Sequence, residues 1–228
     1  MSGEDIIFVG GSKGGVGKSM VSSSLIDYFR NIVDKPVCLI ETDTSNPDVY
    51  KAYREIVEHK LIDIDESDGW VEMMDTIASK PEYVFVINSA ARSSIAVKKY
   101  GSILNGAGED LKRRLITLWV INRQRDSLEL LKEFLVTMHK SELHVLLNKY
   151  YGEPSKYVIY NDSQLKKEVE ARGGKSLSFP DVADRVSDEI NMKRFSIEKA
   201  LKETTYGSRV EIERWRNAYK ELFEELLK

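Results

Sequence analysis

Short apolar runs alternate with longer amphipathic stretches along most of the chain. Five runs are apolar at nearly every position, as expected of strands buried on both faces: residues 6–9, 36–40, 83–87, 115–121 and 143–147. Between them, apolar residues at helical spacing predict helices over residues 18–33, 47–57, 68–79, 91–104 and 127–139. Strands that alternate with helices form βαβ units. We therefore expect an α/β fold with a doubly wound, mainly parallel sheet flanked by helices.

The pattern is less regular after Tyr150, where glycine and proline interrupt it at residues 152–154 and 173–174. Residues 179–181, Phe-Pro-Asp, predict a strand end that leads into a helix. The last segment, 208–227, predicts an amphipathic helix because its apolar residues repeat at intervals of three and four: Ile212, Trp215, Tyr219, Leu222 and Leu226. We expect the apolar face of this helix to pack against the sheet. The alternative is that this face binds a partner protein or a second copy of the chain.

No linker or repeat divides the chain, so we expect one domain over residues 1–228. Its nucleotide-binding core would span about 5–150, residues 151–207 would complete the fold, and the amphipathic helix would occupy 208–228. A length of 228 residues with 42% hydrophobic and 31% charged residues supports a large core and a soluble surface.

Composition excludes several classes of protein. The apolar runs are shorter than the roughly 18 to 20 residues that cross a bilayer, and the acidic N-terminus is unlike a secretory signal. A single cysteine, Cys38, provides neither an internal disulfide nor a zinc or iron–sulfur site. We expect a cytoplasmic protein without membrane attachment.

The stretch over residues 10–19, Gly-Gly-Ser-Lys-Gly-Gly-Val-Gly-Lys-Ser, lies between a predicted strand and a predicted helix. Glycines let successive backbone amides turn toward an anion, and the helix N-terminus adds its dipole. Lys18 is placed to reach the β- and γ-phosphates of a nucleotide, and the Ser19 hydroxyl to bind Mg²⁺. A structural glycine turn is the alternative, since the strict GxxxxGK[ST] pattern would require glycine where this chain has Ser12.

Residues 12–19 resemble the deviant Walker A motif of the ParA/MinD family of ATPases. The resemblance implies a P-loop NTPase of the Rossmann-like type that binds ATP and Mg²⁺. It implies that the nucleotide contacts Gly14, Gly15, Val16, Gly17, Lys18, Ser19 and Met20. It also implies that Lys13 is a signature lysine, which reaches the phosphates of the other subunit in an ATP-dependent homodimer. The catalytic residues would then be Lys13, Lys18 and Asp43.

Acidic and amide residues follow the next two predicted strands. The family has a D-x-D arrangement where this chain has Glu41 and Asp43, which implies that Asp43 positions Mg²⁺ and the attacking water. Alternatively, Asp43 caps the following helix. Asn88 lies where the family has an aspartate that holds a water of the Mg²⁺ shell. An amide can bond that water but brings no charge, so we expect weaker Mg²⁺ binding and slow or absent hydrolysis.

Asn122 ends the fourth predicted strand, near the position from which the family recognises adenine. Its amide offers both a donor and an acceptor to the base. The alternative is that the Asn122 side chain satisfies backbone groups of its own loop. No guanine-recognition signature is present, so ATP is the expected nucleotide.

The leading hypothesis is a slowly hydrolysing ATPase that acts as a dimeric switch, with a partner protein, in plasmid or chromosome partition, transfer or protein positioning. Short relatives with altered motifs at the Asn88 position also occur among plasmid transfer and mobilisation proteins. A second hypothesis is a nucleotide-binding adaptor that hydrolyses nothing. A third is a small-molecule kinase or ligase that uses the same loop.

Charge is unevenly distributed although the net charge is only −3. Residues 41–79 carry eleven acidic and three basic residues, whereas 92–125 carry eight basic and two acidic ones. The basic stretch offers a candidate surface for non-specific, salt-dependent DNA binding. It contains Lys98, Lys99, Lys112, Arg113, Arg114, Arg123 and Arg125. Two ordinary solvated surfaces are the alternative.

Overall fold

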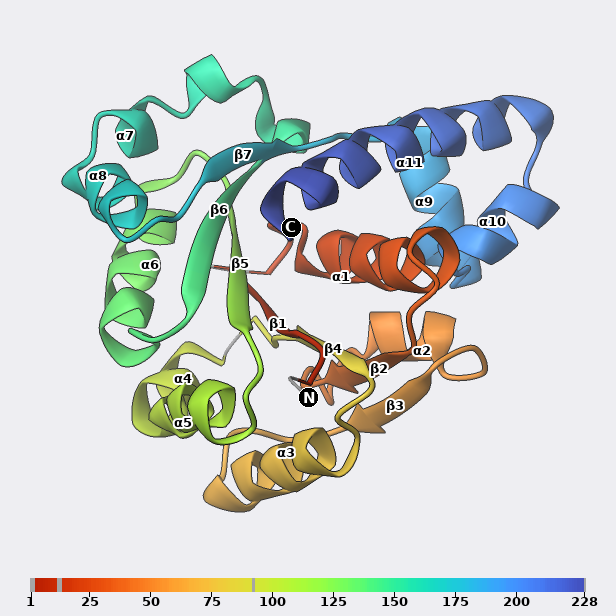
Figure 1. Ribbon diagram of the computed structural model, residues 1–228. Helices are drawn as coiled ribbons and strands as arrows, with labels where there is room; N and C mark the ends of the chain where they lie inside the picture. The colour runs from red at the N-terminus through yellow and green to blue at the C-terminus, as the bar shows by residue number, and fades with distance from the viewer. Residues whose placement is uncertain (1–2, 12–13, 92, 228) are drawn as a thin grey trace.

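The fold is a parallel β-sheet between two layers of helices (Figure 1). The computed structural model describes residues 3–11, 14–91 and 93–227. In this part of the chain the sheet has seven strands in the order β3-β2-β4-β1-β5-β6-β7, and every neighbouring pair is parallel. The strands are β1 Ile6–Gly11, β2 Val37–Glu41, β3 Glu58–Leu61, β4 Val84–Asn88, β5 Leu115–Ile121, β6 Glu142–Asn148 and β7 Ser176–Phe179. The predicted α/β fold class is confirmed.

The five strands predicted from apolar runs form the middle of the sheet, where both faces are buried. The two strands at its edges differ. The sequence of β3 is Glu-His-Lys-Leu and that of β7 is Ser-Leu-Ser-Phe. Edge strands contact fewer side chains and tolerate polar residues, so their sequences carry no continuous apolar run. The apolar pattern therefore did not predict β3, and for β7 it indicated only the strand end at Phe179.

One helical layer covers the sheet face on which Ile7, Val9, Leu39 and Val86 are buried. Its core also contains Leu25 and Trp215. The helices of this layer are α1 Lys18–Asp27 with its π-helical continuation η1 Tyr28–Ile32, α2 Asp48–Tyr53, α9 Asp184–Lys193, α10 Ile197–Glu203 and α11 Tyr206–Leu226.

The other layer packs on Ile6, Phe8, Ile40 and Phe85. Its helices are α3 Ser67–Ser79, α4 Ser94–Tyr100, α5 Ser102–Asp110, α6 Arg125–Thr137, α7 Val158–Asn161 and α8 Gln164–Ala171. The single helix predicted over residues 91–104 was wrong. The chain forms two helices there, α4 and α5, and Gly101 is the residue between them.

The order of the strands places the glycine-rich loop at the centre of one sheet edge. Strand β1 lies between β4 and β5, so the loop that follows β1 emerges where the connections diverge to the two halves of the sheet. Ligands of doubly wound sheets bind at such a point, outside the carboxyl ends of the strands. The 3₁₀ helices η2 Lys149–Tyr151 and η3 Pro154–Lys156 follow β6 at the same edge.

The amphipathic helix α11 packs on the sheet side, as predicted. Its apolar residues Ile212, Trp215, Tyr219 and Leu222 are all buried in the core that contains α1. A polar contact also joins the two helices. Asp27, fully buried on α1, accepts hydrogen bonds from Arg216 Nε at 2.7 Å and from the Tyr219 hydroxyl at 2.6 Å.

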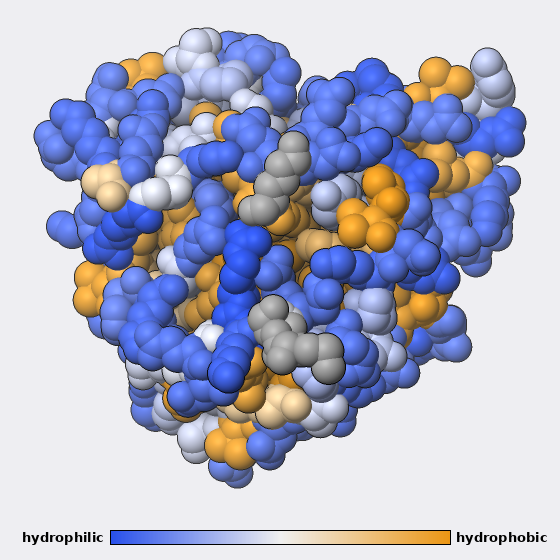
Figure 2. All heavy atoms as spheres, in the orientation of Figure 1, coloured by the Kyte–Doolittle hydropathy of each residue, from blue (hydrophilic) through white to orange (hydrophobic). Residues whose placement is uncertain are grey.

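The molecular surface in the view of Figure 2 is mostly hydrophilic, with separate hydrophobic spots. Scattered exposed apolar side chains of this kind are ordinary on a folded protein. None of the helices in the described part of the chain combines the length and the apolar character that a bilayer crossing requires.

Candidate functional site

A cavity of about 740 Å³ opens at the carboxyl edge of the sheet, beside the glycine-rich stretch 10–19, which we call the phosphate loop after its predicted role. It collects eight of the predicted site residues: Gly14, Gly15, Gly17, Lys18, Ser19, Met20, Asp43 and Asn88. Val16 is fully buried beneath the loop. Lys13, the predicted signature lysine, lies outside the described residues. The volume falls within the range of about 300–1,000 Å³ that is usual for cofactor pockets.

Two glycines give the phosphate loop its shape. Gly15 has φ +80° and Gly17 has φ +109°, a left-handed region that residues with a Cβ rarely adopt. A Cβ at Gly17 would also lie 2.4 Å from Asn148 Nδ2. The following helix α1 begins at Lys18, so its N-terminal amides and dipole lie at the cavity wall.

Lys18 lines the cavity with only 7% of its surface exposed. Burial lowers the pKa of its ammonium group to about 8, and the nearby carboxylates of Asp43 and Glu41 oppose that shift. A buried cation of this kind gains most from a neighbouring anion, because little water screens the interaction. The Lys18 environment therefore suits a phosphate group.

Asp43 lies in the loop between β2 and α2, and it also lines the cavity. Its Oδ1 accepts a hydrogen bond from the Asn46 backbone amide at 2.9 Å. Helix α2 begins at Asp48, beyond this turn, so Asp43 shapes the loop rather than capping the helix directly. One carboxylate oxygen thus orders the loop, while the residue remains at the cavity wall.

Asn88 is fixed by neighbours on both sides. Its Nδ2 donates to the two carboxylate oxygens of Glu41 at 2.9 and 3.1 Å, and its Oδ1 accepts from the Ser22 hydroxyl at 2.8 Å. Glu41 is fully buried and also accepts from the Asp43 backbone amide at 3.0 Å. Burial raises the pKa of Glu41 to about 7. The Asn88 amide therefore bonds a carboxylate and a hydroxyl of the protein itself, in addition to reaching the cavity wall.

Asn122 is held by its own loop. Its Oδ1 accepts from the Gln124 backbone amide at 2.9 Å and from the Ser127 hydroxyl at 2.7 Å. It is absent from the described residues that line the cavity, whereas Asn148, at the end of β6, is among them. Asn148 was not predicted as a site residue. Its position directly after the predicted strand 143–147 was the available signal, because polar side chains at the carboxyl edge of a parallel sheet line ligand sites.

Part of the cavity lining comes from residues beyond 150 that no motif indicated. Pro180 and Asp181 follow β7, and Asp184 and Asp188 lie on α9. The predicted strand end at 179–181 signalled this connection but not its place in the site. The distance along the chain between these residues and the phosphate loop hides their proximity in space.

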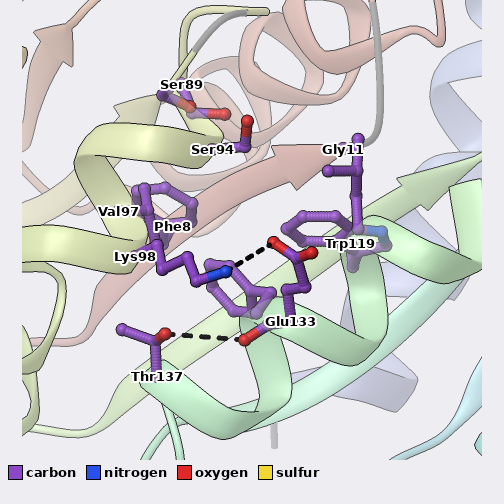
Figure 3. Close-up of a pocket in the computed structure, with 12 residues that line it drawn as sticks. Phe8, Gly11, Ser89, Ser94, Val97, Lys98, Trp119, Glu133 and Thr137 are labelled. Atoms are coloured by element: carbon purple, nitrogen blue, oxygen red, sulfur yellow. Dashed lines mark hydrogen bonds and ion pairs between the residues drawn. The ribbon is translucent and has the colours of Figure 1, made fainter.

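A second cavity, between α4 and α6, lies on the opposite side of the sheet (Figure 3). It is lined by Phe8, Trp119 and Phe134, and an ion pair of 3.6 Å joins Lys98 to Glu133 there. Its volume is about 20 Å³, which is room for roughly one water molecule. The second cavity is therefore too small for a nucleotide.

The basic residues of stretch 92–125 are distributed over separate parts of the structure. Arg113 is buried, and its guanidinium donates to backbone carbonyls of Glu4, Ile77, Lys80 and Tyr83. Arg114 pairs with Asp5 and Glu142. Residues 112–114 precede β5 and residues 123–125 follow it, so they lie at opposite edges of the sheet. The predicted patch is thus not one continuous surface.

Comparison with known proteins identifies relatives over most of the chain. The family model CbiA, the CobQ/CobB/MinD/ParA nucleotide binding domain, matches residues 7–173. The protein named Protein MobD from Acidithiobacillus ferrooxidans is 52% identical over 221 residues, which cover 97% of each chain.

Three solved structures show the same fold. The MinD cell division protein of Aquifex aeolicus is 16% identical, with a TM-score of 0.55 over 94% of this chain and 96% of that one. The MinC:MinD complex of that organism is 14% identical, with a TM-score of 0.54 over 94% of this chain and 95% of that one. MinD of Pyrococcus horikoshii OT3, complexed with Mg-ADP, is 13% identical, with a TM-score of 0.55 over 96% of this chain and 97% of that one.

Proposed function

The chain belongs to the CobQ/CobB/MinD/ParA family of nucleotide-binding domains, and on this premise we propose that it binds ATP with Mg²⁺ and acts as an ATP-dependent dimeric switch. The observation that carries the proposal is the cavity at the carboxyl edge of the sheet, beside the start of α1. It brings Lys18 and Ser19, the first residues of α1, together with Asp43 of the loop between β2 and α2. A buried lysine at a helix N-terminus, a hydroxyl and a carboxylate are the groups that a nucleotide triphosphate with its metal requires.

The residues present are suited to hold Mg²⁺. The Ser19 hydroxyl and the Asp43 carboxylate are oxygen donors, the class of ligand that Mg²⁺ prefers, and both line the cavity. When bound, the ion would neutralise charge on the phosphate oxygens. Lys18 would bind the phosphates, and the loop amides would orient them.

Hydrolysis is proposed to be slow. Asn88 brings no negative charge to the cavity, and its amide already bonds Glu41 and Ser22. This observation also favours a second candidate function, a nucleotide-binding adaptor without turnover. In the switch, Lys13 would reach the nucleotide of the other subunit, so ATP would be needed for dimerisation. The relative named MobD supports a role in plasmid transfer or mobilisation. We propose that the chain acts in this role with a partner protein.

The experiment is calorimetric titration of the protein with Mg·ATP, paired with phosphate release. We expect binding in the wild type and a loss of at least about 100-fold in Lys18→Ala, because the buried cation is removed. Lys220→Ala is the matched control, since the Lys220 side chain is partly exposed on α11 and forms a long ion pair of 3.8 Å with Glu224. Unchanged ATP affinity in Lys18→Ala would contradict the proposal.

Turnover then separates the two candidate functions. Slow phosphate release that Asp43→Asn abolishes would support the ATPase, whereas tight binding with no release would support the adaptor. Light scattering with and without Mg·ATP tests the dimer, and Lys13→Ala should prevent its formation. A monomer under both conditions would eliminate the dimeric switch.

A further inference from the structure

One short segment, residues 148–152, contacts the phosphate loop through hydrogen bonds, and we call it the β6-end segment. Two successive carbonyl oxygens of the loop accept hydrogen bonds from it. Asn148 Nδ2 donates to the Val16 carbonyl at 2.8 Å, and the Tyr151 hydroxyl donates to the Gly15 carbonyl at 2.7 Å. The two donors lie more than 130 positions along the chain from the loop that they contact.

Such donors matter because of how a loop surrounds an anion. When backbone N–H groups turn inward toward phosphate, the carbonyls of the same peptides turn outward and need donors on that side. Gly15, at φ +80°, has no neighbouring atom within 4 Å of where a Cβ would lie. Among the described residues, no side chain packs where a Gly15 Cβ would lie, and the Tyr151 hydroxyl donates to the Gly15 carbonyl.

The β6-end segment is itself well anchored. The Asn148 Oδ1 accepts from the Tyr150 backbone amide at 3.0 Å, and the Asn148 carbonyl accepts from the Tyr157 hydroxyl at 2.6 Å. Tyr157 is buried, and the Gly152 amide closes the turn onto the Lys149 carbonyl at 2.9 Å. A donor carried on an anchored segment restricts its acceptor more than a donor on a freely moving one.

We propose that Tyr151 is a positioning residue for phosphate binding, which acts by holding the Gly15 carbonyl outward so that the loop amides face the ligand. The proposal rests on the proposed function, because it assumes that the loop binds the phosphates of a nucleotide. It adds a residue that lies outside the glycine-rich motif and does not line the cavity among the described residues.

The test compares Tyr151→Phe with Tyr160→Phe in the full-length chain. Each variant loses one hydroxyl hydrogen bond of 2.7 Å, in Tyr160 the bond with Ser176 Oγ between α7 and β7. Titration with Mg·ATP and with inorganic tripolyphosphate measures binding, and thermal unfolding measures stability. We expect Tyr151→Phe to raise the Kd of both ligands about three- to tenfold, the effect of losing one hydrogen bond. We expect Tyr160→Phe to leave both Kd values within twofold of the wild type.

The outcomes separate the inference from the proposed function. A wild type that binds neither ligand removes the proposed function. A wild type that binds, with a Tyr151→Phe variant within twofold of it, overturns the role of Tyr151 and leaves the proposed function standing. Equal weakening in both variants also overturns that role, because general loss of stability would then explain the effect.

Discussion

At the residue scale, the contact between Glu41 and Asn88 defines the polar interior of the site. The two residues are directly paired in the register of β2 and β4, so their side chains lie on the same face at the carboxyl edge. A carboxylate in full burial is unfavourable unless hydrogen bonds satisfy it, and Asn88 Nδ2 and the Asp43 amide provide them. The amide at residue 88 is therefore suited to a carboxylate at residue 41.

We expect Glu41→Gln to change how stability depends on pH. The pKa of Glu41 is raised to about 7 in the folded protein, from 4.5 in an unperturbed chain. The folded state therefore binds this proton more tightly than the unfolded state, and stability falls as pH rises between these two values. As pH rises from 4.5 to 8, the free energy of unfolding of the variant should therefore increase relative to that of the wild type by on the order of 3 kcal/mol.

Urea unfolding of the ligand-free protein at pH 5 and pH 8 checks this expectation. Other groups titrate in both proteins, so their contributions cancel when the unfolding free energy of the wild type is subtracted from that of the variant. A constant difference across the two pH values would show that Glu41 titrates in the ordinary range.

Asn88→Asp should place a second carboxylate within about 3 Å of Glu41, since the present contacts are 2.9 and 3.1 Å. Two carboxylates so close cannot both ionise without repulsion. We expect a loss of unfolding free energy on the order of 3 kcal/mol at pH 8, and a smaller loss at pH 5, where the pair shares a proton.

The double variant Glu41→Gln/Asn88→Asp restores one acid and one amide to the pair. It should recover stability to within about 1 kcal/mol of the wild type, so the two substitutions would be strongly non-additive. Additive losses in denaturant unfolding would mean that the two side chains do not interact.

At the scale of elements, the site depends on how α1 is fixed, because this helix begins at Lys18. Its far end carries Asp27, whose Oδ1 accepts from Asn31 Nδ2 at 2.8 Å and whose Oδ2 contacts Arg216 and Tyr219 of α11. Helix α11 thus holds the helix that follows the phosphate loop.

Helices α8, α10 and α11 begin at side-chain caps. The side-chain oxygens of Ser163, Ser196 and Thr205 accept hydrogen bonds from backbone amides in the first turns of these helices.

We expect Arg216→Met to destabilise the protein by about 2–4 kcal/mol, because it leaves the Asp27 carboxylate buried without its cation. Asp27→Asn combined with Arg216→Met should be less destabilising than Arg216→Met alone, since no charge then remains buried. Chemical denaturation measures both.

The control is Lys220→Ala, which removes an exposed ion pair on the same helix and should change stability by less than about 0.5 kcal/mol. Equal effects of Arg216→Met and Lys220→Ala would show that the contact with Asp27 contributes little.

At the scale of the whole molecule, the parallel sheet decides which charges lie together. Every strand runs in the same direction, so residues that precede strands lie at one edge and residues that follow them lie at the other. Lys112 and Arg123 lie at opposite ends of β5, whose seven residues span about 23 Å. This distance is longer than the Debye length at physiological salt, so the two charges are screened from each other. Local charge along the chain is therefore a poor guide to the charge of one surface.

We expect any binding to duplex DNA to depend only weakly on salt. Arg113 is buried, and Lys98 and Arg114 are paired with carboxylates. Lys112 lies at the opposite edge of the sheet from Arg123 and Arg125, and Lys99 is exposed on α4. Three phosphate contacts, from Lys99, Arg123 and Arg125, would give a slope of log K against log salt no steeper than about −3. Fluorescence anisotropy with a labelled duplex at several salt concentrations measures this slope. Arg123→Ser/Arg125→Ser should flatten it, and a slope beyond about −5 in the wild type would contradict the separated arrangement.

The sequence alone determined the central strands, the glycine-rich loop and α11, because each depends on local pattern: continuous apolar runs, glycines beside a lysine, and helical spacing. The tertiary structure decided the rest. It added the polar edge strand β3, brought Asn148 and Tyr151 to the loop and Pro180 to the cavity, and buried Arg113 away from solvent. These features depend on which strand ends share one edge of the sheet, and strand order is set by packing between residues far apart in the chain rather than by their neighbours in sequence.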